Sequence, residues 1–485
     1  MLAREGGSLA EPADVRSLFP DLKSPVPVAR QLIHNFREAI RSGVLAEGSR
    51  LLPTRELAAR IGISRNTVVV AIDQLVAEGY LVTRVGSGTF VARGVAAPPK
   101  PRTAAPLRLP PAAQRYLDVA PLVAPWPGKL VPFRVGVPDL TAFPLTAWER
   151  LAHRSRTLVS RYSYGDRAGL PRLRGTLAEH LRQARGLAVR PEDIIVVDGA
   201  QSALSLIADV LLEVGDRVLL EDPCYFAARA AFGAHGATIV PVAIDDDGLD
   251  ARSAPPAKLT YLTPSHQYPL GGTMSPERRD AVLAWAHRND AYVIEDDYDG
   301  EFRFASRPAP AMQGSDDQGR VIYVGTFSKV LAPGLRLGFL VSPPHLTAAF
   351  QAARAVRSLG TSAHAQLILA DFIAEGYLAR HVRRMTAEYQ RRVKTLAELL
   401  QPLSGTLTVG PVTGGMHLTV RATRPLDDVA VTNVALENGL SLYALSNECI
   451  ARTDLRGFVL GVGMAPCDAM PLAIDSLAAS LAAVT

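Results

Sequence analysis

Seven short apolar runs between residues 194 and 342 place the strictest limit on how this chain of 485 residues can fold. The runs are rich in β-branched residues, and segments with helical periodicity separate them. Continuous apolar strands that alternate with helices are typical of a parallel or mixed sheet buried on both faces. We therefore predict an α/β fold for most of the chain, with strands in residues 194–199, 217–222, 238–244, 258–264, 291–297, 320–329 and 335–342.

A stretch rich in Pro and Ala, residues 91–114, divides the chain into two unequal parts. It lacks the periodic apolar positions that a packed face requires, and such sequences form semi-extended linkers. We predict an N-terminal arm (residues 1–22), a small domain (23–93), a linker (94–128) and a large domain (129–485).

Basic residues are concentrated in the small domain. Residues 23–93 hold ten Lys and Arg against five Asp and Glu, whereas residues 129–485 hold 36 against 37. A short basic module on a nearly neutral body indicates a nucleic-acid-binding domain, although an ordinary solvated surface has the same composition.

The composition also bears on the compartment. Three scattered cysteines provide neither a disulfide framework nor the ligand spacing of a zinc site. No signal-peptide pattern opens the chain, and no apolar run approaches the ~20 residues of a membrane span. We expect a cytoplasmic protein without a membrane partner.

The small domain has the element order of a winged helix-turn-helix. Apolar positions predict a helix from residue 28 that ends at Gly43, and a second short helix that ends at Gly62. Ser64 suits the N-cap of a third helix, and two β-rich runs follow around a Gly-Ser-Gly turn. In this fold the third helix enters the major groove of DNA, and the hairpin forms the wing.

The segment LLPTRELAARIGISRNTVVVAIDQLVAEGYLVTRVGSGTFV resembles the GntR family of bacterial regulators over nearly all of residues 28–92. The resemblance implies that the partner is a double-stranded DNA operator. Arginine suits guanine edges, while hydroxyls and glycine amides suit phosphates. Ser64 also has a structural use as a cap, and the glycines as a turn. The resemblance assigns base or phosphate contacts to Arg55, Ser64, Arg65, Asn66 and Thr67, and wing contacts to Arg84, Gly86, Ser87 and Gly88.

Two motifs in the large domain together supply the parts of a pyridoxal phosphate site. In YVGTFSKVLAPGLRLGF a strand ends in hydroxyl residues before Lys329, and AYVIEDDYDGEFR ends another strand in acids and a tyrosine. A carboxylate can hold a pyridinium nitrogen protonated, a phenol can hydrogen-bond the ring oxygen, and a lysine can form an imine.

This region resembles fold-type I aminotransferases, and with the DNA-binding domain the whole chain resembles the MocR-type subgroup of the GntR family. The resemblance implies pyridoxal 5'-phosphate as cofactor, Lys329 as its catalytic Schiff-base lysine, and a homodimer. Asp297 is the alternative to Asp296 if the register differs by one residue. The resemblance assigns Asp296 to the pyridine nitrogen, Tyr298 to the ring oxygen, Arg336, Gly199, Ala200 and Gln201 to the phosphate, Tyr225 to stacking, Tyr164 to the neighbouring subunit's phosphate, and Thr326, His266 and Gln267 to the surrounding site.

The residues that would recognise an effector are less clear. Aminotransferases bind the substrate carboxylate with an arginine near the last strand, where LRGFVLGVG has Val459. Arg452 and Arg456 are the candidates that remain. Without that guanidinium the grip on a carboxylate is weakened, which favours the cofactor itself as effector over an amine or amino acid.

The sequence therefore predicts a transcription regulator that senses pyridoxal phosphate, an amine or an amino acid, and controls genes of vitamin B6 or of amine and amino-acid metabolism. Weak transamination or half-reactions are compatible with this role. The alternatives are an active aminotransferase with a fused DNA-binding domain, and a DNA-binding scaffold whose cofactor site is inactive.

Overall fold

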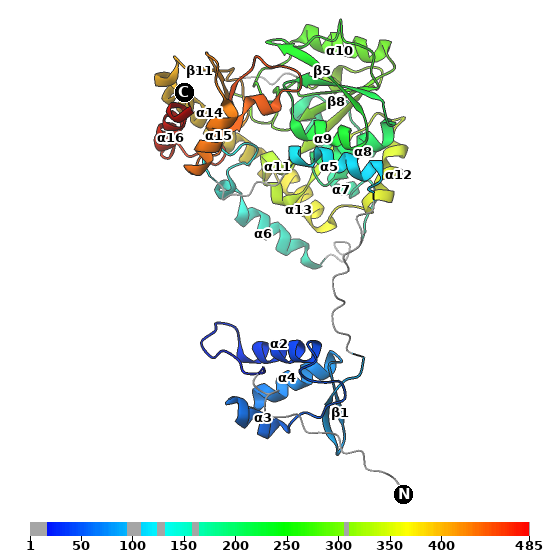
Figure 1. Ribbon diagram of the computed structural model, residues 1–485. Coiled ribbons are helices and arrows are strands. Elements are labelled where there is room, and N and C mark those ends of the chain that lie inside the picture. Colours follow the sequence, from blue (N-terminus) through cyan, green and yellow to red (C-terminus); the bar gives the residue numbers. More distant parts are fainter. Residues whose placement is uncertain (1–16, 95–107, 124–130, 158–163, 305–309, 485) are drawn as a thin grey trace. The chain divides into compact units, whose positions relative to one another are not determined.

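The computed structural model describes residues 17–94, 108–123, 131–157, 164–304 and 310–484. The chain separates into two compact units, Met1–Arg108 and Leu109–Thr485, which are described separately (Figure 1). Most of the N-terminal arm, residues 1–16, lies outside the described residues. No helix within the described ranges is long and apolar enough to cross a membrane.

The small unit is a winged helix-turn-helix, as its sequence predicts. Its core is built from the apolar faces of three helices, where Phe36, Leu57 and Leu75 are almost completely buried. The wing is a two-stranded antiparallel hairpin with Arg84 opposite Gly88. The elements are α2 (Val28–Arg41), α3 (Thr54–Ile61), α4 (Arg65–Ala77), β1 (Leu81–Arg84) and β2 (Gly88–Val91).

An eight-stranded mixed sheet forms the centre of the large unit, with the order β3-β10-β9-β8-β7-β4-β5-β6. Neighbours from β9 to β5 run parallel, whereas β10 is antiparallel to both β3 and β9. The strands are β3 (Ile194–Val197), β4 (Arg217–Asp222), β5 (Thr238–Asp245), β6 (Gly248–Leu249), β7 (Leu259–Leu262), β8 (Tyr292–Asp297), β9 (Val321–Thr326) and β10 (Gly338–Val341). All seven predicted strands are present.

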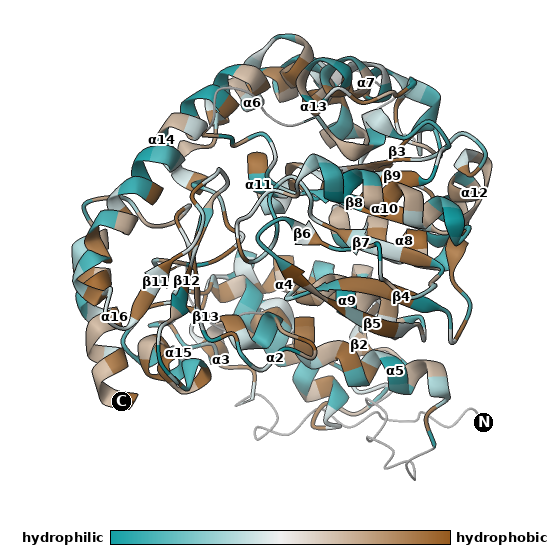
Figure 2. Ribbon diagram, turned by 90° about the horizontal axis from the view of Figure 1, so that it is seen from above, coloured by the Kyte–Doolittle hydropathy of each residue, from teal (hydrophilic) through white to brown (hydrophobic). Residues whose placement is uncertain are grey.

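Helices cover both faces of this sheet, which is why its strands are apolar throughout rather than alternating. Successive strand residues point to opposite faces, so Ile195 and Val197 pack with one helical layer while Ile194 and Val196 pack with the other. Figure 2 shows the strands largely in brown, with the helices around them. The first layer includes α8 (Ala200–Leu211), α9 (Phe226–Ala234) and α12 (Thr347–Ser358), and the second includes α7 (Pro171–Arg185), α10 (Pro276–Arg288) and α13 (Ala363–Ala374).

The carboxyl-terminal part of the large unit is a smaller antiparallel sheet with the order β11-β12-β14-β13. Residues 131–137 join this sheet, because Phe133 forms a bridge with Gly461 of β14. The elements are α14 (Tyr377–Leu399), β11 (Leu407–Val409), β12 (His417–Ala422), α15 (Asp428–Glu437), β13 (Tyr443–Ala444), β14 (Gly457–Gly461) and α16 (Met470–Val484).

The predicted linker is shorter in the structure than in the sequence prediction. Within residues 94–128, α5 (Pro111–Val119) and a 3-10 turn (Ala120–Val123) belong to the large unit. Pro111 occupies the first turn of α5, where a missing N–H costs nothing, and Arg115 donates a hydrogen bond to the Ala234 carbonyl oxygen at the end of α9. Docking on α9 therefore orders a segment whose composition indicates an extended chain.

Ser64 gives the fold a direct stability test. Its hydroxyl accepts a hydrogen bond from the Thr67 backbone N–H at 3.1 Å and caps α4. Replacing an N-cap serine by alanine costs about 1 kcal/mol, whereas glycine costs only a few tenths. We expect Ser64→Ala to lower the opening free energy of α4 by about 1 kcal/mol in amide hydrogen exchange of the full chain, and Ser64→Gly to be the mild control. Equal losses in the two variants would contradict this role.

Candidate functional site

The candidate site is a cavity of about 260 Å³ in the large unit, between the central sheet and the carboxyl-terminal part. Parallel strands place the residues that follow them at one edge of the sheet. Asp296 is the last but one residue of β8, and α11 (Phe327–Val330) follows β9 and carries Lys329. Six predicted residues line the cavity: Lys329, Asp296, Tyr298, Tyr225, Ala200 and Thr326.

The two neighbouring aspartates at the end of β8 face opposite sides of the sheet. Asp296 lines the cavity, where its Oδ2 accepts a hydrogen bond from the Tyr261 hydroxyl at 2.8 Å. Asp297 points to the other face and forms a buried ion pair with Arg185 at 2.6 Å, beside a hydrogen bond from the Tyr323 hydroxyl. Strand alternation thus places Asp296, and not Asp297, at the cavity.

Asp296 is held in an environment that favours a cationic partner. Burial raises the pKa of Asp296 to about 7, because a buried carboxylate loses its hydration. Its Oδ1 is buried and has no hydrogen-bond partner among the described residues. A protonated ring nitrogen would supply both the missing donor and the opposite charge.

Lys329 contacts the segment of residues 131–137, of which residues 134–137 also line the cavity. Its Nζ donates a hydrogen bond to the Gly136 carbonyl oxygen at 2.8 Å. Burial lowers the pKa of Lys329, because the ammonium form is poorly solvated there. A lowered pKa increases the share of neutral amine, which is the form that can react with an aldehyde.

The amino end of α8 forms an anion cradle next to the cavity. Gly199 precedes the helix with φ 96°, a conformation that strongly favours glycine. The Arg336 guanidinium lies over Gly199 and donates to the Asp198 carbonyl oxygen at 2.6 Å. Helix amides and a guanidinium together suit a phosphate.

Aromatic side chains line much of the remaining wall. The Tyr298 hydroxyl lies 3.0 Å from His266 Nδ1, which also contacts both carboxylate oxygens of Asp299 at 3.0 Å. His266 therefore supports Tyr298 from behind and is not itself among the residues that line the cavity. Tyr225 packs edge to face against Tyr268, a further wall residue.

Taken together, these residues fit pyridoxal phosphate. The orphaned Oδ1 of Asp296 matches a ring N–H, the α8 cradle matches a phosphate, and Lys329 lies at the same cavity. The apolar and aromatic walls match the faces of a ring.

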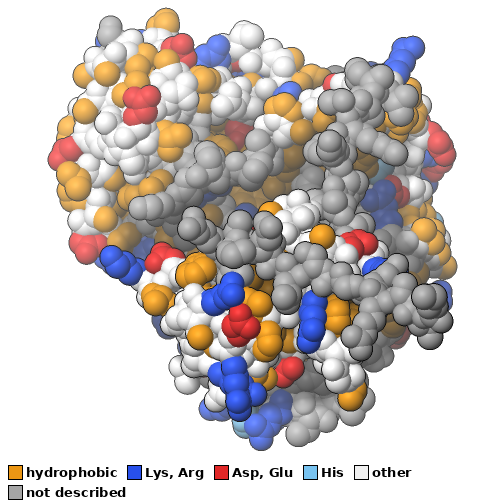
Figure 3. Space-filling model, turned by 60° about the horizontal axis from the view of Figure 1, so that its bottom comes forward, with side chains coloured by type: hydrophobic (Ala, Val, Ile, Leu, Met, Phe, Trp, Pro, Cys, Tyr) orange, Lys and Arg blue, Asp and Glu red, His pale blue; other side chains and the backbone are white. Residues whose placement is uncertain are grey.

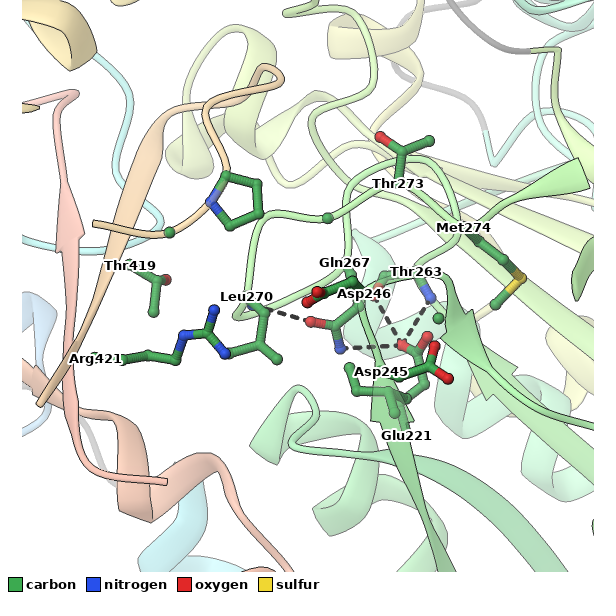
Figure 4. Close-up of a pocket in the computed structure, with 15 residues that line it drawn as sticks. Glu221, Asp245, Asp246, Thr263, Gln267, Leu270, Thr273, Met274, Thr419 and Arg421 are labelled. Atoms are coloured by element: carbon green, nitrogen blue, oxygen red, sulfur yellow. Dashed lines mark hydrogen bonds between the residues drawn. The ribbon is translucent and has the colours of Figure 1, made fainter. Parts of the chain in front are cut away.

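The structure does not bring every predicted site residue to the cavity. Gln267 was expected there, but its amide donates to the carbonyl oxygens of Pro223 and Tyr268 and lies 3.4 Å from the Glu221 carboxylate. Figure 4 shows Gln267 and Thr263 turned toward Glu221 in a separate pocket of about 40 Å³. The Gln267 amide satisfies a buried carbonyl oxygen of its own loop, at Tyr268, and another after β4, at Pro223.

Two more predicted residues lie outside the cavity lining. Gln201 donates to the Ala227 carbonyl oxygen and lines an outer groove of about 880 Å³. Tyr164 is 80% exposed on this chain, and its contact with a neighbouring subunit stays a prediction.

The arginines predicted for the effector also lie elsewhere. Arg452 forms an ion pair with Asp454 at 2.6 Å, and Arg456 donates to the Leu455 carbonyl oxygen. Neither lines the cavity. Instead Arg134 lies in its wall, and its guanidinium is 5.8 Å from the centre of the Tyr443 ring.

Sequence reasoning missed Arg134 because no sequence motif leads to it. Arg134 lies more than 300 residues from Tyr443, and tertiary contacts such as the bridge between Phe133 and Gly461 of β14 show that the two segments meet. Tyr261 was missed because residues 258–264 were interpreted only as an apolar strand, and His417 was missed because β12 is not among the predicted strands.

The predicted DNA contacts lie on the surface of the small unit. Arg55, Arg65, Asn66 and Arg84 are exposed, and Arg84 also stacks over the Phe90 ring at 5.1 Å. Figure 3 shows Lys and Arg side chains in blue on the face of this unit that is turned toward the viewer. Ser64 and Thr67 are joined in the cap of α4, so their hydroxyls already have a structural use. The tip of the wing holds Gly86, Ser87 and Gly88.

Comparisons with known proteins agree with both units. Residues 28–91 match the family described as bacterial regulatory proteins, gntR family, and residues 129–457 match aminotransferase class I and II. The chain is 40% identical to "Probable rhizopine catabolism regulatory protein MocR" of Rhizobium meliloti, covering 96% of each chain. It is 34% identical to "HTH-type pyridoxine biosynthesis transcriptional regulator PdxR" of Corynebacterium glutamicum, covering 90% of this chain and 92% of that protein.

A solved structure shows the same fold for the large unit. The kynurenine aminotransferase of Pyrococcus horikoshii, solved with PMP, superposes with a TM-score of 0.68 at 26% identity. The match covers 78% of this chain and 95% of that chain.

Gly136 provides a test of the site geometry. A Cβ there would lie 2.8 Å from Lys329 Nζ, and its φ of 76° costs other residues about 1–2 kcal/mol. We expect Gly136→Ala to weaken binding of pyridoxal phosphate about tenfold or more, as measured by titration of the visible absorption band. Gly175→Ala is the control, because its Cβ meets nothing within 4 Å. Unchanged affinity in Gly136→Ala would show that Lys329 does not need this approach.

Proposed function

We propose a function on the premise that the chain belongs to the MocR-type subgroup of the GntR family of bacterial regulators, in which a winged helix-turn-helix precedes an aminotransferase class I and II domain. In this proposal the chain is a transcription regulator whose DNA binding responds to pyridoxal phosphate and to a small amine or amino acid. The observation that carries the proposal is the buried Oδ1 of Asp296, which has no hydrogen-bond partner among the described residues and lies in the cavity that Lys329 also lines.

Pyridoxal phosphate, when bound, supplies an aldehyde that condenses with primary amines. Lys329 would hold it covalently through Nζ, and Asp296 would keep its ring nitrogen protonated. Arg336 and the amino end of α8 would bind the phosphate, while Tyr298, oriented by His266, would donate to the ring oxygen.

On the small unit, we propose that α4 and the wing contact operator DNA. Arg65 stands in the first turn of α4 and Arg84 at the tip of the hairpin, and both are exposed. These are the positions from which this fold reaches the major groove and the backbone. Arg55, Asn66, Ser87 and the wing glycines support the same surface.

The remaining parts of the proposal concern assembly and place. The exposure of Tyr164 supports a homodimer in which this residue reaches the site of the other subunit. The cytoplasm is the place where a regulator of this family would meet DNA. A change at the cofactor site would then alter DNA binding by coupling two distinct sites.

An active aminotransferase is the second candidate, because the arrangement of Lys329 and Asp296 at one cavity also suits catalysis. The aromatic-amino-acid aminotransferase 1 of Thermococcus litoralis is 29% identical over 339 residues, which cover 66% of this chain. Sustained turnover of an amino acid by the purified protein would support this candidate.

DNA binding by the full chain tests the proposal. Fluorescence anisotropy would follow binding to the DNA upstream of its own gene, with and without pyridoxal phosphate at fixed salt, because salt sets the apparent affinity. We expect the cofactor to shift the affinity of the wild type and of Lys394→Ala, an exposed control, but not of Lys329→Ala. We expect Arg65→Ala to weaken DNA binding by about 1–3 kcal/mol in both conditions.

The possible results separate the candidates. Equal affinity with and without the cofactor would show that the cofactor is not the signal. Absence of DNA binding together with rapid transamination would favour the enzyme and overturn the regulator.

A further inference from the structure

A small pocket separate from the cofactor cavity contains a buried carboxylate with an unused oxygen. Glu221, the last but one residue of β4, is 1% exposed and lines this pocket of about 40 Å³. Its Oε2 accepts hydrogen bonds from the Thr263 backbone N–H and hydroxyl at 3.2 and 3.0 Å, and from Gln267 Nε2 at 3.4 Å. Its Oε1 is buried and has no hydrogen-bond partner among the described residues. Glu221 therefore offers a free acceptor to a group that enters the pocket.

The lining of the pocket carries more negative than positive charge. Its charged side chains, within the part of the chain that the structure describes, are Glu221, Asp245, Asp246 and Arg421. Asp245 is paired with Arg278 at 2.6 Å, whereas Asp246 and Arg421 form no ion pair with any described residue. Two carboxylates thus remain against one guanidinium, and this balance favours a cation in the pocket.

Burial makes the negative charge of Glu221 unfavourable without a partner. It raises the pKa of Glu221 to about 7, because the carboxylate loses its hydration. A water molecule in the pocket would supply a hydrogen-bond donor but no charge, whereas a cation with N–H groups would supply both. Hydrogen bonds between such charged partners are roughly twice as strong as those between neutral groups.

The size and the walls of the pocket limit what can enter. A buried water requires about 10–15 Å³ of such space, so the pocket of about 40 Å³ holds roughly three non-hydrogen atoms. Glu221 and Thr263 lie on the side of the central sheet, whereas Thr419 and Arg421 come from β12 of the smaller sheet. Figure 4 shows Arg421 extending from β12 toward Leu270. An occupant must therefore be small, and it would lie between the two sheets.

We propose that this pocket is a second ligand site, which binds ammonium or a short primary ammonium group with Glu221 as the counter-ion. The site is distinct from the cofactor cavity, because the two share no residue among those that the structure describes. The ligand would donate an N–H to Glu221 Oε1 and neutralise the buried carboxylate.

A chain of hydrogen bonds links this pocket to the cofactor cavity. The Thr263 hydroxyl donates to Glu221 Oε2 at 3.0 Å and accepts from the Tyr268 backbone N–H at 2.9 Å. Tyr268 in turn lines the cofactor cavity. In the proposed function, on which this step rests, a filled pocket would hold this wall in place and tighten cofactor binding. The ammonium group would then be a second signal, coupled to the cofactor.

Thermal unfolding of the cofactor-free full chain tests the site by itself. Without cofactor no imine with an amine can form, so the result does not depend on the proposed function. Chlorides of ammonium, methylammonium, potassium and tetramethylammonium would be compared at equal concentration. At about ten times the dissociation constant, we expect the first two to raise the unfolding midpoint of the wild type by about 2 °C over tetramethylammonium, which is bulky and has no N–H. Glu221→Gln should abolish this rise, because it removes the counter-ion.

Two further variants guard against a general effect of salt or of folding. Gly272 also lines the pocket, and a Cβ there would meet only the Asp246 carbonyl oxygen within 4 Å, at 3.9 Å. Gly272→Val can therefore narrow the pocket while Glu221 stays intact, and we expect it to lose the ammonium effect. Glu437→Gln, at an exposed position of α15, should keep it. A rise that survives either Glu221→Gln or Gly272→Val, or an equal rise with potassium, would overturn the inference.

Cofactor affinity tests the coupling. Titration of the visible absorption band would give the dissociation constant of pyridoxal phosphate in ammonium and in tetramethylammonium chloride. We expect the wild type to bind the cofactor about fivefold more tightly in ammonium, and Glu221→Gln to show no difference. Direct reaction of ammonium with free cofactor is the same for both chains. Unchanged affinity in the wild type would overturn the coupling, whereas a wild type without any cofactor band would overturn the proposed function and leave the result of thermal unfolding in place.

Discussion

The pair of aspartates at the end of β8 is the constraint on which the large unit depends. Alternation along the strand gives one carboxylate to each face of the sheet, and each has a different partner. Asp297 binds Arg185 of α7 and the Tyr323 hydroxyl of β9, so it joins two elements of the second face. Both charges of this ion pair are buried, and removing one partner from such a pair typically costs about 3–5 kcal/mol. The ion pair of Asp297 on one face of the sheet thus holds the end of β8 that carries Asp296 on the opposite face.

Asp296 is a buried carboxylate that a positively charged ligand would stabilise. Its burial is unfavourable by itself, since one carboxylate oxygen has no donor among the described residues. A cationic ring would offset that cost by pairing with the carboxylate, and this interaction would contribute to the binding free energy of the ring. Burial in the same cavity lowers the pKa of Lys329, so the low-dielectric surroundings shift the pKa of both groups.

Residues 131–137, which are distant in sequence from the other cavity residues, complete this site. The segment around Gly136 packs on β14, and glycines at 461 and 463 allow backbones to approach where a Cβ would clash. The segment supplies the carbonyl oxygen that orients Lys329 and the guanidinium of Arg134. Cavity and carboxyl-terminal sheet are therefore parts of one packing arrangement, and their geometry is set together.

The sequence by itself determined the winged helix-turn-helix, all seven predicted strands and the facing pair of Lys329 and Asp296, because these follow from local periodicity and from motifs at strand ends. It assigned Asp296 to the pyridine nitrogen and kept Asp297 as the alternative, because the two residues differ in the face of the strand and not in chemistry. It misplaced Gln267, which hydrogen-bonds the Pro223 and Tyr268 carbonyl oxygens, and it assigned a linker where α5 packs on α9. Only the tertiary structure brought Arg134 to the cavity, because its contact with the site is long-range and no spacing along the chain records where two distant segments meet.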